Sequence, residues 1–321
     1  MASSITVRPL PPVREQQQQQ QGDKTKESND KEDDQSATKP HHRPGGGGFQ
    51  NPWNSFKQHS LSEALRLRFG SHPEKNFVPV PQGPDGPKRY TPTPCALAEL
   101  PEVDVVCISH NHYDHLDYAT VQHIYDRQGG KVHFVAGLGN KKWFTQHVGC
   151  QEDEHGSGRS INDQGQTLWC SWAIESNGKK LYFAGDTAYK AEDAPAACPA
   201  FEEIGESLGP FDLALLPIGL MSPHQWMGSV HATPEQSLQI HKDVKSRLSI
   251  GMHWGTVRGG ISAHFEDVRD PPRRWQAAAE KEGLWRGGEP QGKPLQTEDT
   301  GSGPSEYGGV GLCEVGETVT V

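Results

Sequence analysis

Short apolar runs alternate with amphipathic segments through the middle and end of the chain. Alternating or continuous apolar runs predict strands over residues 103–109, 131–136, 166–174, 179–184, 212–218, 246–252 and 310–315. Apolar residues at helical spacing predict helices over residues 118–127, 201–208, 234–244 and 273–282. Thr233 precedes Pro234 and stands three residues before Gln236, which is the signal of a capped helix start. The alternation of the two patterns predicts an α/β protein.

Both ends of this patterned region differ from it in composition. Residues 1–48 contain a run of six glutamines, a charged patch and four consecutive glycines, with almost no large apolar side chains. Such a segment buries too little apolar surface to offset its ordering entropy, so it is predicted to be a disordered arm. Residues 286–308 are similarly rich in Gly, Pro, Ser and Glu, and predict a disordered surface insertion. Residues 49–321 are therefore expected to form one domain.

Four potential metal ligands directly follow the predicted strand 103–109: His110, His112, Asp114 and His115. In an extended chain residues i and i+2 share a face, so His110 and His112 can bind one metal while Asp114 and His115 point toward a second. A histidine pair at a strand end is usually only solvated or packed. Three histidines and an aspartate within six residues instead indicate a binuclear metal site.

Two later strands end in the same way. Gly185 and Asp186 follow the predicted strand 179–184, and His253 follows 246–252. Taken alone, a Gly-Asp pair is an ordinary turn and a single such histidine is more often structural. Together with the first cluster, they favour Asp186 as a carboxylate bridging two metals and His253 as the closing ligand of the second metal.

The spacing His-x-His-x-Asp-His resembles the signature of the metallo-β-lactamase superfamily. Further segments resemble N-acyl-phosphatidylethanolamine phospholipase D, in a match over most of residues 87–285. These segments are residues 109–117, 167–172, 183–187, 199–205, 209–214, 217–219 and 252–256. The resemblance implies an α/β (α+β) fold of the αββα sandwich type, with two Zn²⁺ ions at one edge.

The resemblance adds one ligand and one catalytic residue. In the family a metal-binding histidine stands four positions before an arginine, and a Leu-Trp pair follows that arginine nine and ten positions later. His155, Arg159, Leu168 and Trp169 fit this spacing, although the polar stretch around His155 by itself resembles an exposed loop. His231 matches a family active-site histidine that can polarise the phosphate or assist the leaving group. The alternative is that His231 only flanks a helix and has no catalytic role.

The implied chemistry is hydrolysis of a phosphodiester. Two Zn²⁺ ions lower the pKa of a bridging water toward about 7 and stabilise negative charge on the phosphate. The family implies cleavage of N-acyl-phosphatidylethanolamine to N-acylethanolamine and phosphatidic acid, with Asp114 and His231 as catalytic residues. Met221 and Trp226 could form an apolar wall for acyl chains, with ordinary packing as the alternative.

Two family segments are missing from this chain. The family has two strands, with a Gly-His-Ala-Thr or Gly-His-Ala-Ser segment, before the stretch that begins here at Gly86. It has further strands where this chain has only residues 150–154 ahead of His155. The sandwich is therefore expected to be incomplete, as a splice variant or a gene-model error would produce.

Charge and cysteine content restrict the partners. A net charge of −10 without a basic stripe argues against nucleic-acid binding. The pairs Lys88–Arg89 and Arg273–Arg274 could meet a phosphate headgroup, or could simply be solvated. Six cysteines without close spacing, and no signal peptide, favour a reducing compartment. No apolar stretch approaches the length of a membrane span, so contact with a membrane is expected to be peripheral.

A phospholipid is thus the expected substrate. The expected location is the cytoplasm, with peripheral contact to an intracellular membrane as an option, while the first 14 residues leave a mitochondrial location as a weaker option. The oligomeric state stays open. Three functions compete: a binuclear zinc phospholipase D, another hydrolase of the same fold with a smaller phosphate ester, lactone or thioester substrate, and an inactive isoform.

Overall fold

The computed structural model describes residues 40–44, 47–71, 82–83, 86–87, 89, 91–148, 166–256, 265–287 and 308–321. Most of the predicted N-terminal arm, most of the predicted insertion 286–308, and His155 lie outside these residues. The end of the arm is described as a turn: His42 bridges to Phe49, and Arg43 donates a hydrogen bond to the carbonyl of Phe49 at 2.9 Å.

The larger sheet has five strands in the order β5 (Trp172–Ser176), β6 (Lys179–Phe183), β7 (Leu213–Pro217), β8 (Leu248–Met252) and β9 (Gly309–Gly311). β5 and β6 form an antiparallel hairpin, and the remaining neighbours pair in parallel. Parallel strands end at a common edge, so the residues after β6, β7 and β8 are brought together.

Three helices pack on this sheet: α4 (Ala200–Ser207), α6 (Pro234–Asp243) and α7 (Asp270–Lys281). Their apolar faces meet the sheet in one core, whose largest buried side chains include Trp275, Tyr182, Phe211, Leu216 and Leu238. Thr233 caps α6 as its sequence predicts, and accepts a hydrogen bond from the Gln236 backbone at 3.2 Å.

The smaller sheet consists of β3 (Val105–Ile108) paired in parallel with β4 (His133–Ala136). Helices α2 (Tyr118–Arg127) and α3 (Lys141–His147) cover it with a second core that includes Ile108, Leu116 and Trp143. Among the described residues β3 has no second strand neighbour. Such a small sheet agrees with the family strands that are missing from the sequence.

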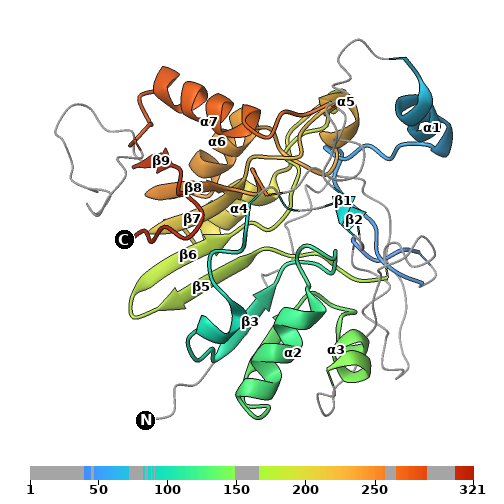
Figure 1. Ribbon diagram of the computed structural model, residues 1–321. Helices are drawn as coiled ribbons and strands as arrows, with labels where there is room; N and C mark the ends of the chain where they lie inside the picture. Colours follow the sequence, from blue (N-terminus) through green and yellow to red (C-terminus); the bar gives the residue numbers. More distant parts are fainter. Residues whose placement is uncertain are drawn as a thin grey trace, which may run out of the picture.

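Figure 1 shows the two sheets between helices: α6 and α7 lie beyond the larger sheet, and α2 and α3 beyond the smaller one. This arrangement is the predicted α/β sandwich. Ser109, which follows β3, accepts a hydrogen bond from the backbone of Cys170 at 2.9 Å, and this bond joins the two halves just ahead of β5.

Short elements complete the described chain. These are α1 (Leu61–Phe69), the two-residue strands β1 (Gln82–Gly83) and β2 (Gly86–Pro87), the 3-10 helix η2 (Leu97–Glu99) and α5 (His224–Met227). Figure 1 shows α1 beside α5 at one end of the molecule.

The predicted helix over residues 118–127 has its observed bounds, and five of the seven predicted strands differ from the observed ones by at most two residues at either end. The predicted strand 310–315 is wrong after Gly311, where β9 ends. The predicted strand 166–174 is wrong over its first six residues, because β5 begins at Trp172. Leu168 donates its backbone N–H to Leu138 and Cys170 donates to Ser109, so this segment bonds to loops at the other sheet before β5 begins. Helices α1 and α3 were not predicted. The segment of α1 does carry apolar residues at helical spacing, Leu61, Leu65 and Phe69, whereas the seven-residue α3 is too short to show a clear apolar period.

Candidate metal centre

The first group of candidate ligands stands on a tight loop between β3 and α2. The backbones of His115 and Leu116 both donate to the carbonyl of His112, at 3.0 and 2.8 Å. Leu116 is fully buried, and Asp117 caps α2 by accepting from the Thr120 backbone at 2.8 Å. Packing and capping therefore hold the loop at both ends and position its histidines at the end of β3.

Asp186 reaches this loop from the larger sheet. It follows β6 through Gly185, which has a φ of +64° and approaches Ser109 so closely that a Cβ would lie 2.5 Å from the Ser109 Cβ. Only glycine fits this approach. His253 follows β8 at a φ of +63° and lies beside Asp186, as the common edge of parallel strands requires.

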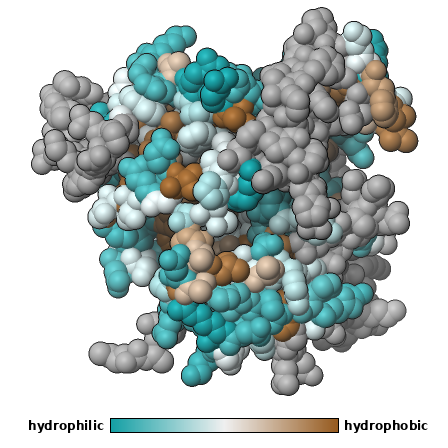
Figure 2. Space-filling model, in the orientation of Figure 1, coloured by the Kyte–Doolittle hydropathy of each residue, from teal (hydrophilic) through white to brown (hydrophobic). Residues whose placement is uncertain are grey.

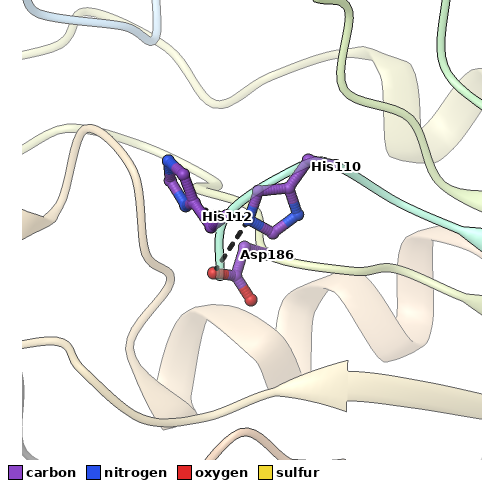
Figure 3. Close-up of side chains that lie close together, drawn as sticks. All are labelled: His110, His112 and Asp186. Atoms are coloured by element: carbon purple, nitrogen blue, oxygen red, sulfur yellow. Dashed lines mark hydrogen bonds and ion pairs between the residues drawn. The ribbon is translucent and has the colours of Figure 1, made fainter. Parts of the chain in front are cut away.

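The carboxylate of Asp186 lies between the two predicted ligand groups. Its Oδ2 is 3.6 Å from Nε2 of His110 and 3.2 Å from Nε2 of His115, and its Oδ1 is 3.1 Å from Nε2 of His253. Figure 3 shows the ring of His110 directed at this carboxylate, with the ring of His112 beside it. Asp186 thus stands where a carboxylate shared by two cations would be required.

The ligand-type atoms form overlapping sets suited to metal binding. In each of three sets the atoms lie within 4.8 Å of one another: His110, His112 and Asp186; Asp114, His115 and His253; and Asp186, His231 and His253. Nε2 of His115 and Oδ1 of Asp186 are buried. Apart from their ion-pair contacts with each other's side chains, with Asp114 and with His253, they have no hydrogen-bond partner among the described residues. Buried polar atoms without hydrogen bonds, converging from imidazoles and carboxylates, fit a divalent cation such as Zn²⁺.

The electrostatics of the cluster separate its histidines. Burial lowers the pKa of His110 to about 3, and the neighbouring His115 adds to this effect. Burial alone would lower the pKa of His115, but the carboxylates of Asp114 and Asp186 raise it to about 9. Burial would raise the pKa of Asp114, whereas contact with His115 holds it at about 2. The pKa of Asp186 is held well below its usual range by its histidine neighbours, against the effect of burial.

His231 lies at the cluster, with its ligand-type atom within 4.8 Å of those of Asp186 and His253. Its ring stacks on His253 with centroids 5.3 Å apart, and its backbone is held by a hydrogen bond to Met227. Burial lowers the pKa of His231 to about 4, and its Nδ1 is buried without a hydrogen bond to the described residues. A neutral imidazole with a spare nitrogen can donate to a substrate oxygen or bind a metal.

Two residues that sequence reasoning missed support the site. The hydroxyl of Ser109 lies 3.1 Å from Nδ1 of His110 and fixes the ring orientation, a contact that a polar residue just before a predicted ligand could have signalled. The carboxylate of Glu266 accepts backbone N–H groups from Leu220, Met221 and Ser222, at 2.9, 2.6 and 3.1 Å. No sequence pattern pointed to Glu266.

For Met221 and for the pair Arg273–Arg274, the structure favours the ordinary alternative over a contact with substrate. Met221 is only 2% exposed and is therefore a packed core residue, not part of an open apolar wall. Arg273 and Arg274 are ion-paired with Asp270 and Glu235, so they form intramolecular pairs and not a phosphate site. Lys88 lies outside the described residues.

No helix of the described segments is long and apolar enough to span a bilayer. The described cysteines, Cys95, Cys107, Cys170, Cys198 and Cys313, carry free thiols.

A two-sheet sandwich with histidines and aspartates at its strand ends defines the class of metal-dependent hydrolases of the β-lactamase fold. The chain belongs to the beta-lactamase superfamily domain family, whose model matches residues 79–151 and 140–254. These matches cover more than half of the chain.

The chain is also similar to individual proteins. It is 34% identical over 224 residues to N-acyl-phosphatidylethanolamine-hydrolyzing phospholipase D 1 of Caenorhabditis elegans, covering 61% of each protein. It is 31% identical over 197 residues to the mitochondrial N-acyl-phosphatidylethanolamine-hydrolyzing phospholipase D of Saccharomyces cerevisiae, covering 53% of this chain and 40% of the relative. The chain thus spans about three fifths or less of the length of these relatives, which agrees with the interrupted resemblance seen in the sequence.

A solved structure, the metallo hydrolase Igni18 of Ignicoccus hospitalis, matches with a TM-score of 0.42 at 23% identity, over 68% of this chain and 79% of that one.

Proposed function

We propose that the chain is a binuclear zinc phosphodiesterase that hydrolyses N-acyl-phosphatidylethanolamine to N-acylethanolamine and phosphatidic acid. The observation that carries the proposal is the position of the Asp186 carboxylate between His110 and His115 on one oxygen and His253 on the other. The substrate class comes from the names of the two phospholipase relatives. A phospholipid substrate implies at least peripheral contact with a membrane, and the name of the Saccharomyces cerevisiae relative keeps the mitochondrial option.

The residues divide into two ligand sets that share Asp186. His110, His112 and His155 would hold one zinc ion, and Asp114, His115 and His253 the other. Together the ions would supply Lewis acidity that lowers the pKa of a water nucleophile and stabilises charge developing on the phosphate. His155 enters this set from the family spacing alone.

His231 is proposed to contact the substrate. Its imidazole is neutral because burial lowers its pKa to about 4, so it can donate an N–H to a phosphate or leaving-group oxygen. Ser109 holds the ring of His110 by the 3.1 Å contact with its Nδ1, and thereby directs Nε2 of that ring toward the shared carboxylate.

The decisive experiment combines metal content with lipid turnover. The purified chain is expected to hold two zinc ions per molecule by elemental analysis and to release N-acylethanolamine from N-acyl-phosphatidylethanolamine in mixed micelles. Asp186→Asn should lose at least one metal and reduce turnover by about 100-fold or more, since a neutral amide leaves the two cations less shielded from each other. Asp193→Asn is the matched control, because Asp193 is exposed and pairs only with Lys57 among the described contacts.

Four outcomes would contradict parts of the proposal. Normal metal content and turnover in Asp186→Asn would remove Asp186 from the site. Equal zinc occupancy before and after His155→Ala would leave His155 as a loop residue. Two bound metals with hydrolysis of a small phosphodiester, lactone or thioester but not of the lipid would favour the second function, and a metal-free chain without activity would favour the inactive isoform.

A further inference from the structure

The imidazole of His231 is a polar group that is turned away from solvent. Hydrophilic side chains make up most of the coloured surface in Figure 2, whereas Nδ1 of His231 is buried and has no hydrogen-bond partner among the described residues. Nδ1 of His253, on the ring that stacks against His231, is in the same situation. A buried polar atom without a partner is destabilising unless a bound group satisfies it. Both rings are therefore suited to bind a group that the described chain does not supply.

The two oxygen atoms of Asp186 divide the histidines of the cluster. Oδ2 faces Nε2 of His110 and of His115, at 3.6 and 3.2 Å, whereas Oδ1 faces Nε2 of His253 at 3.1 Å. A ring nitrogen of His231 lies within 4.8 Å of the ligand atoms of Asp186 and His253. The rings of His231 and His253 are nearly parallel, with centroids 5.3 Å apart and planes 18° apart. Two imidazoles and one carboxylate at such distances can bind one cation.

The backbone holds His231 at this position from both sides. Its own N–H donates to the carbonyl of Met227, and the N–H of Ala232 donates to the carbonyl of Thr187, both at 2.8 Å. Thr187 directly follows Asp186, so the second bond joins the backbone next to His231 to the backbone next to the shared carboxylate. Ala232 is fully buried. The imidazole is therefore preorganised beside Asp186, as a metal ligand must be.

We propose that, in the chain without substrate, His231 binds the same metal as His253 and the Asp186 carboxylate. This inference rests on the proposed function, which places two metals at Asp186 and assigns His231 only to the substrate. Because His253 also belongs to a set with Asp114 and His115, this metal would have five protein ligands: Asp114, His115, Asp186, His231 and His253. A catalytic zinc site ordinarily keeps one position for water or substrate. The metal beside His253 is thus fully ligated by the protein until substrate arrives.

The two roles of His231 belong to different states of the chain. A ring nitrogen that binds a metal cannot donate an N–H at the same time. Rotation of the side chain between rotamers can move the ring from the metal to a phosphate oxygen while the two backbone hydrogen bonds stay in place. His231 is therefore a metal ligand without substrate and a hydrogen-bond donor when substrate is bound.

The test counts metal-bound imidazoles, with cobalt(II) in place of zinc. Each imidazole bound to cobalt(II) gives a strongly shifted N–H proton signal in the NMR spectrum, and these signals are counted for the full chain without substrate. His231→Ala should show one signal fewer and should bind one of the two ions at least about tenfold more weakly. His231→Phe keeps a ring against His253 and should give the same result, which excludes lost stacking as the cause.

His224→Ala is the matched control. His224 lies on α5, and its Nδ1 is also buried without a hydrogen-bond partner among the described residues, but it belongs to no candidate ligand set found in them. The control should keep every shifted signal and both metal affinities. Thermal melting of the metal-free variants is measured alongside, because an unfolded variant would lose several signals and not one.

Turnover is not the readout, because both roles of His231 predict its loss. Unchanged signals and affinities in His231→Phe overturn the inference and leave His231 as a substrate contact alone, and so does loss of the same signal in His224→Ala. If the His231 variants lose one signal but the unchanged chain does not hydrolyse the lipid in mixed micelles, the proposed function fails while the ligand assignment stands.

Discussion

Gly185 and Ser109 touch across the two sheets, at a separation where a Cβ on Gly185 would lie 2.5 Å from the Cβ of Ser109. Gly185 directly precedes the candidate ligand Asp186, and Ser109 directly precedes the candidate ligand His110. The distance between these ligands is therefore set by how closely two backbones approach.

Gly185→Ala should damage both stability and the metal centre. The substitution places a side chain at a φ of +64° and against Ser109, so we expect a loss of about 2–4 kcal/mol in the free energy of unfolding. Gly178→Ala is the control: its φ is +74°, but nothing lies within 4 Å of the added Cβ, so only the backbone penalty of about 1–2 kcal/mol applies. Urea denaturation and zinc content measure the effect. Equal losses for the two variants would show that the close contact is unimportant.

Metal binding should depend on pH through His115. Its pKa of about 9 in the metal-free chain means that a metal must displace a proton from this ring at neutral pH. Apparent zinc affinity should therefore rise as the pH increases from 7 to about 9, with proton release visible by calorimetry in buffers of different ionisation enthalpy. Because the folded pKa is raised above the ordinary 6.5, the protonated ring stabilises the metal-free fold below about pH 6.5, and that stability is lost as the pH rises through about 9.

Asp114→Asn provides the control for this pH effect. It removes one of the two carboxylates beside His115, so the loss of metal-free stability should move to lower pH. An unchanged pH profile in this variant would contradict the assignment to His115.

Glu266→Gln should loosen the loop after β7. Three backbone N–H groups lose a charged acceptor, at a cost of about 1–3 kcal/mol in the free energy of unfolding. Gly219 in this loop packs against the backbone of His253, so occupancy of the metal bound by Asp114, His115 and His253 should also fall. Glu282→Gln, which breaks an exposed pair with Lys242, should change stability by less than about 1 kcal/mol. Similar losses in both variants would show that the three backbone contacts of Glu266 contribute no more to stability than an exposed ion pair.

Restoring the two missing family segments should stabilise the chain. β3 has β4 as its strand partner and no second one among the described residues, so its other edge presents backbone groups that a further strand would pair. Each buried unsatisfied group costs about 1–3 kcal/mol, against a total stability of about 5–15 kcal/mol for a typical domain. Insertion of the family hairpin between Gly86 and Pro87, and of its strand pair before Glu154, should raise the melting temperature, the zinc content and the rate of lipid hydrolysis.

Glycine-serine inserts of the same length at the same two points are the control, and should bring no gain. If the chain without inserts already melts cooperatively, binds two metals and turns over lipid at the restored rate, the gaps are harmless.

Much of the centre was predictable from local patterns. The apolar run before His110 and the similar runs before Asp186 and His253 predicted three strand ends that carry ligands, and the structure brings these residues together. The prediction works because parallel strands end at one edge, so a strand end in the sequence becomes a neighbour in space. The shared orientation of His110 and His112 followed from their two-residue spacing in an extended chain.

Other features had no local signal, because they arise between segments far apart in the chain. The ligand-type atom of His231 lies within 4.8 Å of those of Asp186 and His253, and this position depends on the turn after α5. The burial of Met221 and the pairing of Arg274 with Glu235 depend on α7 packing beside α6. His59, just ahead of the nine-residue helix α1, stacks on Trp226. This contact decides which side of the helix faces solvent.

The sequence by itself determined the types of the ligands, the strands that present them and the class of the fold, since apolar periodicity and strand-end composition are properties of neighbouring residues. Only the tertiary structure decided how far apart those ligands stand, which histidine becomes neutral and which holds its proton, and which apolar face stays in solvent. Distances, burial and the pKa shifts that follow from burial depend on contacts between separate elements, which no single segment contains.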